Sequence, residues 1–449
     1  MRGVANADLT PELVVALGRA AARVLGPGPF FVGRDTRVSG PLLRAALTAG
    51  ITAEGEDVVD LGILPTPGVA CLSAADGLPA AMLSASHNPF PDNGINFFAA
   101  GGRKLTDDSE QALEAELDRV LDAGPPRDPP TGGDVGAITH GLGGRERYEA
   151  SVIATLEGRR LDGLRVVIDC AHGAAFAVAP SVLRRLGADV TVLNARPDGT
   201  NINAGCGSTH PDGLQRRVVA EGAQLGLAFD GDADRVLAVD HEGRLVDGDQ
   251  LVALCALDRR DRGLLAGDTV VITVMTNLGF RLAMAEHGIK CVETQVGDRY
   301  VLEALEEGGW SLGDEQSGHV IFRDLATTGD GLLTGLQVLD AVVRTGRPLA
   351  ELAGVMTRLP QVLHNVRVAD RDGLDAAQAL WSEVRRTEAE LGDRGRVLVR
   401  PSGTEPVVRV MVEAPTPEDA EAAVARLSAA VERSLGPAEG GALGSSPDP

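Results

Sequence analysis

One α/β pattern occurs three times along this chain and limits the folds that it can adopt. In each copy a helical run ends at a glycine, Gly55, Gly187 or Gly288, and a short β-branched strand follows. Glycine is common at helix ends because it adopts the left-handed backbone without strain. The copies lie roughly 100 to 130 residues apart, too long a period for a solenoid. Uninterrupted apolar runs such as 165–169 predict strands buried on both faces of a mixed or parallel sheet.

Beyond residue 360 the pattern changes to shorter strands and two alanine-rich helices, which predicts a smaller α+β domain. The expected fold class is therefore α/β, with three related α/β domains followed by this smaller one. We expect the domains to span 1–140, 145–252, 253–360 and 365–436. A Pro/Gly-rich linker is expected at 124–136, and the segment 437–449, low in apolar residues, is predicted to be a disordered tail.

The charge of the chain restricts its partners. Its 64 acidic residues exceed the 42 basic ones, for a formal charge of -22, which disfavours nucleic acid and anionic membranes. A phosphate ligand would need a locally basic pocket. The only lysines are Lys104 and Lys290, and neither is followed by Ser or Thr, so a Walker A phosphate loop is excluded.

Two further absences in the sequence bear on location and redox chemistry. The five cysteines contain no C-x-x-C pair, which favours reduced, mostly buried thiols. Neither an apolar signal core nor a run of 18 apolar residues occurs, so we expect a cytoplasmic protein.

Asp230, Asp232 and Asp234 alternate in a loop between two apolar strands. Three carboxylates so spaced can converge on a hard cation, which prefers oxygen ligands. An EF-hand needs Gly at its sixth position and Glu at its twelfth, where this chain has Arg235 and His241. A metal site is favoured over a solvated acidic turn.

Three other segments carry polar side chains suited to a phosphosugar. The first, Ser84 to Pro89, presents Ser86 beside His87 after a strand, a turn that by itself is more often structural than nucleophilic. The second, 315–319, places Glu315, Ser317 and His319 on one face if it is extended, where they could hold sugar hydroxyls. The third offers hydroxyls, a glycine and two guanidinium groups for a phosphate dianion: Arg400, Ser402, Gly403, Thr404 and Arg409.

Taken together and in their order along the chain, the four segments resemble those of the α-D-phosphohexomutase superfamily. Within it, they most resemble the bacterial enzymes that act on glucosamine phosphates. Supporting runs are GRDTRVSG at 33–40, LGILPTPGVA at 61–70, SASHNPFPDNGINFF at 84–98, DCAHGAA at 169–175, VGDRYVLE at 296–303 and GDEQSGHVIF at 313–322. The resemblance covers nearly the whole chain. It implies four domains around a central cleft, and possession of a mutase activity that interconverts glucosamine 6-phosphate and glucosamine 1-phosphate through a bisphosphate intermediate.

The resemblance also implies roles for the residues of these segments. Ser86 would be carried as a phosphoserine, with Mg²⁺ between its phosphate and Asp230, Asp232 and Asp234. His87 and Arg235 would act with Ser86 in catalysis. The sugar would be held by Glu315, Ser317 and His319, and its non-reacting phosphate by Arg400, Ser402, Gly403, Thr404 and Arg409. The expected partners are the phosphorylated hexosamine and its bisphosphate, with no nucleic acid, no membrane and possible homodimer formation.

Three positions depart from the family pattern. Asn96 stands where relatives have a lysine thought to act in proton transfer, and Lys104 or His87 is the candidate to replace it. Asp314 stands where the sugar loop usually has glycine. The chain begins Met1-Arg2-Gly3-Val4, where relatives carry a short first strand, so we expect either a misassigned start or a missing strand.

Three alternative functions remain open. A phosphomannomutase/phosphoglucomutase would share the catalytic loops, although the run GDEQSGH favours the amino sugar. A non-catalytic phosphosugar-binding relative would bind ligand without turnover, and a metal-dependent phosphatase would release inorganic phosphate.

Overall fold

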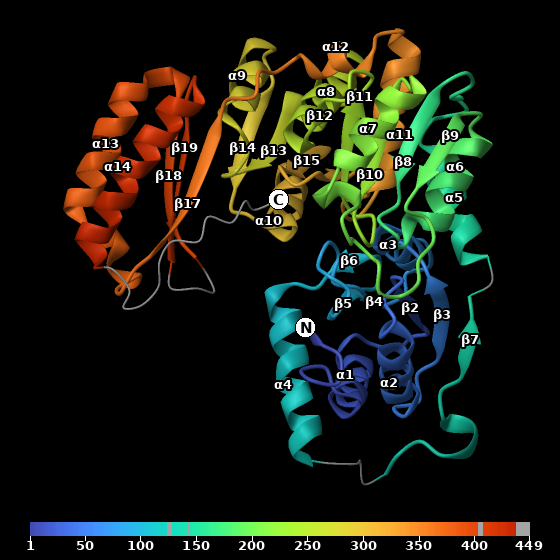
Figure 1. Ribbon diagram of the computed structural model, residues 1–449. Helices are drawn as coiled ribbons and strands as arrows, with labels where there is room; N and C mark the ends of the chain where they lie inside the picture. Colours follow the sequence, from blue (N-terminus) through green and yellow to red (C-terminus); the bar gives the residue numbers. More distant parts are fainter. Residues whose placement is uncertain (124–127, 142, 403–406, 437–449) are drawn as a thin grey trace. The chain divides into compact units, whose positions relative to one another are not determined.

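A computed structural model describes residues 1–123, 128–141, 143–402 and 407–436. These residues form two compact units, Met1–Met275 with Gly288–Val355, and Thr276–His287 with the chain from Met356 onwards. The first unit contains three sheets and the second unit one. Each unit is described separately below (Figure 1).

The first sheet of unit 1 is mixed and has the strand order β1-β5-β4-β2-β3-β7, with β6 paired to β5. Strands β4, β2, β3 and β7 run parallel, whereas β5 is antiparallel to β4 and to β1. The strands are β1 (Arg2–Val4), β2 (Phe30–Arg34), β3 (Val58–Ile63), β4 (Ala80–Leu83), β5 (Asp92–Ala99), β6 (Arg103–Lys104) and β7 (Ile138–His140). The helices are α1 (Pro11–Val24), α2 (Gly40–Thr52), α3 (Thr66–Asp76), α4 (Asp107–Ala123) and α5 (Gly144–Ala154).

The second sheet has the order β12-β11-β10-β8-β9. Its central strands β8, β9 and β10 are parallel, and β11 returns antiparallel to β10. The strands are β8 (Arg165–Asp169), β9 (Asp189–Leu193), β10 (Leu225–Phe229), β11 (Val236–Asp240) and β12 (Leu245–Val246), and the helices are α6 (Ala175–Arg185) and α7 (Asp212–Glu221). Strand β10 is wholly buried, as its uninterrupted apolar run predicts.

The third sheet has the order β14-β13-β15-β16, again with parallel strands and one antiparallel partner. Its strands are β13 (Thr269–Thr273), β14 (Lys290–Thr294), β15 (Leu312–Glu315) and β16 (His319–Phe322). The accompanying helices are α8 (Gly248–Asp261), α10 (Asp298–Gly308), α11 (Gly331–Thr345) and α12 (Leu349–Ala353). Helix α11 packs against β10 and β11 as well as β16, and so joins the second and third sheets of unit 1.

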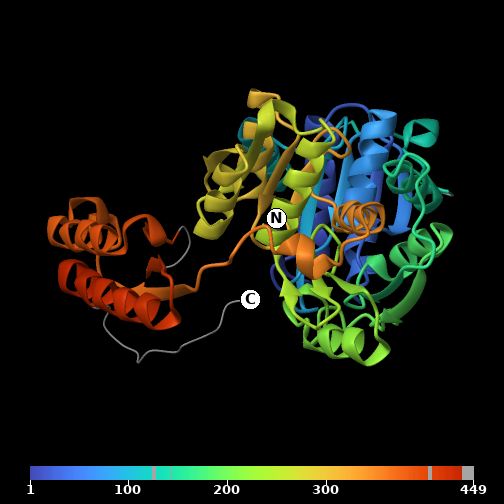
Figure 2. The ribbon, with the colours of Figure 1, turned by 90° about the horizontal axis from the view of Figure 1, so that it is seen from above.

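Unit 2 contains an antiparallel sheet of order β17-β19-β18 together with helix α9 (Leu278–Glu286). The strands are β17 (Gln361–Arg367), β18 (Arg396–Pro401) and β19 (Val407–Glu413). Helices α13 (Gln378–Leu391) and α14 (Pro417–Leu435) lie side by side against this sheet, as both ribbon views show (Figures 1 and 2). The three mixed sheets and this smaller antiparallel one confirm the predicted α/β fold class.

The glycines that led to this prediction adopt the expected backbone. Gly55, Gly187 and Gly288 have φ values of 92°, 93° and 70°, and each follows the end of a helix. The expectation of a missing first strand is wrong, because Arg2–Val4 pairs with Asp92–Gly94. The linker and tail predictions fall largely on 124–127 and 437–449, outside the described residues. The four domain boundaries remain a prediction.

Within the described residues, the helices are all too short or too polar to cross a lipid bilayer.

Candidate active site

Ser86 lies in the turn between β4 and β5, in the first sheet of unit 1. Its φ of 49° lies in the left-handed region, which is uncommon for a residue with a side chain and marks a constrained position. The side chain is 8% exposed. Its Oγ donates a 2.5 Å hydrogen bond to Asp230 Oδ2 and lies 3.4 Å from His87 Nδ1. The structure therefore brings together three predicted site residues.

A buried network holds the Ser86 turn, and the sequence analysis did not assign its members. The Ser86 carbonyl oxygen accepts hydrogen bonds from Arg37 Nη2 at 3.0 Å and from Asn203 Nδ2 at 2.8 Å. Asp35 pairs with Arg37 at 2.9 Å, and Ser84 Oγ, which donates to Asp35, accepts the Ser86 N–H. Asp35 and Arg37 belong to the run GRDTRVSG, so that run contained a signal, whereas nothing in the sequence indicated Asn203.

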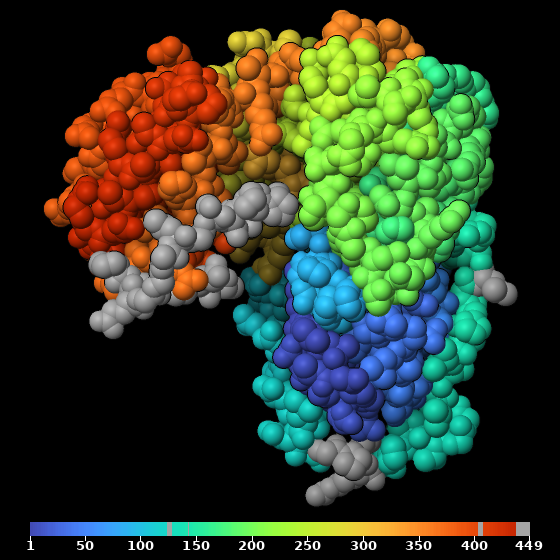
Figure 3. Space-filling view, in the orientation of Figure 1, coloured from blue at the N-terminus to red at the C-terminus, as the bar shows by residue number. Residues whose placement is uncertain are grey.

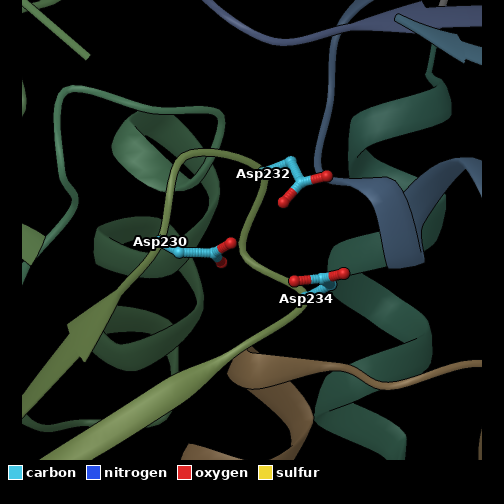
Figure 4. Close-up of side chains that lie close together, drawn as sticks. All are labelled: Asp230, Asp232 and Asp234. Carbon is cyan, nitrogen blue, oxygen red and sulfur yellow. The ribbon is translucent and has the colours of Figure 1, made fainter. Parts of the chain in front are cut away.

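The acidic loop joins β10 to β11, and all three predicted carboxylates turn towards one space (Figure 4). Oxygens of Asp230, Asp232 and Asp234 lie within 4.8 Å of one another. Thr66, the first residue of α3, donates to Asp232 Oδ2 at 2.5 Å and thereby ties this loop to the first sheet. Despite burial, Asp232 Oδ1 and Asp234 Oδ1 have no hydrogen-bond partner among the described residues. Unsatisfied carboxylate oxygens at such spacing fit a hard cation.

The electrostatics of the trio are also compatible with a bound cation. Burial and the neighbouring carboxylates raise the pKa of Asp230 well above its usual value, and they raise the pKa of Asp232 to about 6. Burial acts in the same direction on Asp234, but His319 and Arg235 outweigh it and lower the pKa of Asp234. A divalent cation would allow all three groups to ionise together.

Two further residues predicted to act in catalysis, His87 and Arg235, differ in their surroundings. Burial and the charge of Arg235 lower the pKa of His87 to about 4, so its imidazole is neutral near pH 7. Arg235 donates its backbone N–H to Asp230 Oδ1, and its Nε lies 3.9 Å from Asp234.

The segment predicted to hold the sugar, 315–319, is a tight hairpin, so the extended conformation that would place Glu315, Ser317 and His319 on one face does not occur. Glu315 ends β15 and His319 begins β16, and the two residues face each other as an antiparallel pair. A Cβ on Gly318 would lie 2.3 Å from the Val236 carbonyl oxygen, so the hairpin packs closely on β11. His319 is buried, with Nδ1 3.4 Å from Asp234 Oδ2. The Oγ of Ser317 is also buried and lacks a hydrogen-bond partner within the part of the chain that the structure describes.

The described residues of the segment predicted to bind phosphate, Arg400, Ser402 and Arg409, lie in unit 2. Arg400 on β18 and Arg409 on β19 are paired across the strands, and their proximity and burial lower the pKa of Arg400. Ser402 is buried and its N–H donates to Val407 at 2.9 Å. Gly403 and Thr404 lie outside the described residues. The structure thus groups the serine, metal and sugar loops in unit 1 and places the two arginines together in unit 2.

In the space-filling view, the blue N-terminal segment lies against the green segment of unit 1 (Figure 3). The loops of Ser86 and Asp230 meet through the hydrogen bond between these two residues. A serine hydroxyl beside a carboxylate trio that fits a hard cation is a combination suited to phosphoryl transfer.

Comparison with known families identifies the class to which such a fold and site belong. The phosphoglucomutase/phosphomannomutase descriptions match throughout: alpha/beta/alpha domain I at 1–123, domain II at 146–243, domain III at 247–359 and the C-terminal domain at 363–430. The chain belongs to the phosphoglucomutase/phosphomannomutase family, which confirms the phosphohexomutase resemblance.

Individual relatives agree with this assignment. A phosphoglucosamine mutase of Symbiobacterium thermophilum is 55% identical over 427 residues, covering 92% of this chain and 93% of its own. A phosphoglucosamine mutase of Streptomyces avermitilis is 54% identical, covering 97% and 98%. Among solved structures, a phosphoglucomutase/phosphomannomutase family protein of Burkholderia thailandensis superposes with a TM-score of 0.80 at 27% identity, covering 97% of this chain and 96% of that one.

Proposed function

We propose that this chain interconverts glucosamine 6-phosphate and glucosamine 1-phosphate through a phosphorylated Ser86 and a bisphosphorylated sugar. The observation that carries the proposal is the Ser86 hydroxyl hydrogen-bonded to Asp230, within a carboxylate trio whose spacing fits a metal ion. The amino sugar is favoured because relatives at 54% and 55% identity over nearly their full length are phosphoglucosamine mutases.

The proposed reaction has two phosphoryl transfers, the first from Ser86 to the sugar and the second from the other end of the sugar back to Ser86. In the first half, the bond from phosphorus to Ser86 Oγ breaks and a bond to a sugar oxygen forms. That sugar hydroxyl loses its proton, and Ser86 Oγ regains one. In the second half the bisphosphate has turned over, and Ser86 Oγ loses its proton and forms a bond to the phosphorus at the other end of the sugar. The bond from that phosphorus to its sugar oxygen breaks, and this oxygen takes up a proton. Asp230, which accepts the hydroxyl hydrogen of Ser86, orients this oxygen for attack.

Asp230, Asp232 and Asp234, with a phosphate on Ser86, would hold the metal ion, and we propose Mg²⁺ because all these ligands are oxygens. The ion would neutralise charge on the phosphoryl oxygens. Arg235 would add positive charge beside it. The sugar would contact Glu315, Ser317 and His319, and the non-reacting phosphate would bind Arg400, Ser402, Gly403, Thr404 and Arg409. Residence in the cytoplasm and a homodimer remain predictions.

The test is a mutase assay on glucosamine 6-phosphate with Mg²⁺ and a bisphosphate primer, comparing wild type with Ser86→Ala. The exposed Ser382→Ala is the matched control. Product formation, phosphate mapped to Ser86 by mass spectrometry and loss of both in Ser86→Ala alone would support the proposal.

Other outcomes would point to the alternatives. Faster turnover of mannose or glucose phosphates would indicate a phosphomannomutase/phosphoglucomutase. Free phosphate released in proportion to turnover would indicate a phosphatase, and ligand binding without product would indicate a non-catalytic relative.

A further inference from the structure

Lys104 is one of only two lysines among the 42 basic residues of the chain. The other, Lys290, begins β14 and is exposed. Lys104 ends β6, and its ammonium group donates a hydrogen bond to Asp298 Oδ2. The side chains of Lys104 and Asp298 are 31% and 23% exposed to solvent, so a small molecule can reach this ion pair.

The ion pair is linked to the acidic loop that joins β10 to β11 through one side chain, that of His319. Asp298 is the first residue of α10, and its Oδ2 also lies 3.5 Å from His319 Nε2. On the other side of the ring, His319 Nδ1 lies 3.4 Å from Asp234 Oδ2. Lys104, Asp298, His319 and Asp234 therefore form a continuous chain of contacts in which basic and acidic side chains alternate. It connects the first sheet to the acidic trio.

The register of the first sheet places Lys104 on the same face as Asn96. Lys104 is paired with Phe98 across the antiparallel strands, and such partners project to the same face. Asn96 lies two residues before Phe98 and shares its face. Ile95, Phe97 and Leu105 point the other way, into the core formed with α1, α2 and α4. A lysine side chain from position 104 can thus reach the space in front of Asn96, whose amide has no charge.

We propose that Lys104 is a further catalytic residue, whose ammonium group contacts the phosphorylated sugar during phosphoryl transfer, with Asp298 as its positioning residue. The inference rests on the function proposed above. Charge supports it: the surrounding groups Asp298, Asp234 and Asp232 are carboxyls, and a transferring phosphoryl group adds negative charge. Burial acts against the ammonium form, but these carboxyls outweigh it and raise the pKa of Lys104, so the group stays charged near pH 7.

The choice of Lys104 over His87 follows from position. His87 is adjacent to Ser86, and its Nδ1 lies 3.4 Å from Ser86 Oγ, so it faces the enzyme's own oxygen. Lys104 instead lies on strand β6 and pairs with Asp298, the first residue of α10. Its ammonium group is therefore free of direct contact with Ser86 among the hydrogen bonds that hold it, and it is the better candidate to contact the substrate.

The first test is Lys104→Met, which keeps an unbranched side chain close in length to the lysine stem and removes the charged amine. We expect kcat to fall about 100-fold, the typical effect of losing one donor to a developing charge, while KM changes less than about threefold because the interaction strengthens in the transition state. Lys290→Met is the matched control and should leave both constants unchanged. Lys104→Arg, which keeps the charge, should remain within about tenfold of wild type.

The decisive test is rescue by Asn96→Lys in the Lys104→Met background, since both positions face the same space. Recovery of at least about tenfold in kcat would support the proposal, because a structural role of Lys104 at Asp298 would not be restored from β5. Melting temperatures would show that the variants fold. Wild-type kcat in Lys104→Met, or a folded double variant without recovery, would overturn the inference and leave the proposed function intact. An inactive primed wild type would overturn both.

Discussion

Ser86 Oγ donates a 2.5 Å hydrogen bond to Asp230 Oδ2, although the two residues lie 144 positions apart in the chain. Their loops also meet through the backbone, because a Cβ on Gly231 would lie 2.5 Å from the Ser86 carbonyl oxygen. The same carbonyl accepts hydrogen bonds from Arg37 and Asn203. The distance between hydroxyl and carboxylate is thus fixed by backbone contact and by hydrogen bonds together.

Gly231→Ala tests this close approach. The added methyl group would meet the Ser86 carbonyl oxygen and Asn203 Nδ2 at 2.8 Å, so the two loops must separate. We expect a loss of about 1–3 kcal/mol in the free energy of unfolding and a fall in kcat of about 100-fold, since small displacements of reacting groups cost that much. Mutase kinetics and urea unfolding would measure these effects. Gly213→Ala in α7, where a Cβ meets nothing within 4 Å, is the control. Equal kcat in the two variants would contradict the prediction.

Metal binding to the acidic trio should depend on pH. Burial and Asp234 raise the pKa of Asp232 to about 6, and a cation binds the ionised carboxylate. Mg²⁺ affinity should therefore rise as pH increases from about 5 to 7, with release of protons on binding. Isothermal titration calorimetry in buffers of different ionisation enthalpy would count these protons.

Asp232→Asn should weaken Mg²⁺ binding in the same titrations by at least about tenfold, because it removes one of three anionic ligands. The exposed Asp189→Asn, on β9, is the matched control and should bind like wild type. An affinity independent of pH, or unchanged in Asp232→Asn, would show that the cation binds elsewhere.

Asp330 should make stability fall with rising pH. This buried residue caps α11 by accepting the N–H of Leu333, and Tyr148 donates to its carboxylate at 2.9 Å. Burial nevertheless raises the pKa of Asp330 from 3.8 to about 6. A raised carboxyl pKa means that its contribution is fully present below pH 3.8 and is lost between pH 3.8 and about 6.

In Asp330→Asn the cap is kept and the ionisation is removed. The free energy of unfolding of wild type relative to this variant should decrease by up to roughly 3 kcal/mol between pH 4 and pH 7. Urea unfolding at both pH values would measure the difference. A constant difference would show that Asp330 ionises freely in the folded chain.

The sequence predicted those parts of the site that depend on local pattern. Alternation of Asp230, Asp232 and Asp234 between apolar runs located the acidic loop, and Gly187 located a helix end. Contacts between segments far apart in the chain could not be predicted from the local sequence pattern. Thus the support of Ser86 by Asn203 was missed, and the hairpin at Gly318 was not foreseen. Burial of His319 between Asp234 and Asp298 likewise depends on three separate segments.

The Arg396–Glu413 ion pair should be a main determinant of stability in unit 2. Glu413 is fully buried on β19 and lies 3.1 Å from Arg396 Nε. It also accepts the N–H of Leu278 at the start of α9. Burial raises the pKa of Glu413, while the charge of Arg396 opposes this rise. Without its partner, the carboxylate would remain desolvated and unpaired.

Arg396→Met should therefore cost about 3–5 kcal/mol, whereas Arg386→Met, at an exposed ion pair with Glu390, should cost at most about 1 kcal/mol. In a Trp310→Phe background the fluorescence of Trp381 on α13 would report unfolding of unit 2 alone. Adding Glu413→Gln to Arg396→Met should recover part of the loss, because the charge left unpaired is removed. Equal stability of the Arg396 and Arg386 variants would mean that water reaches Glu413, and the buried charge would then carry no penalty.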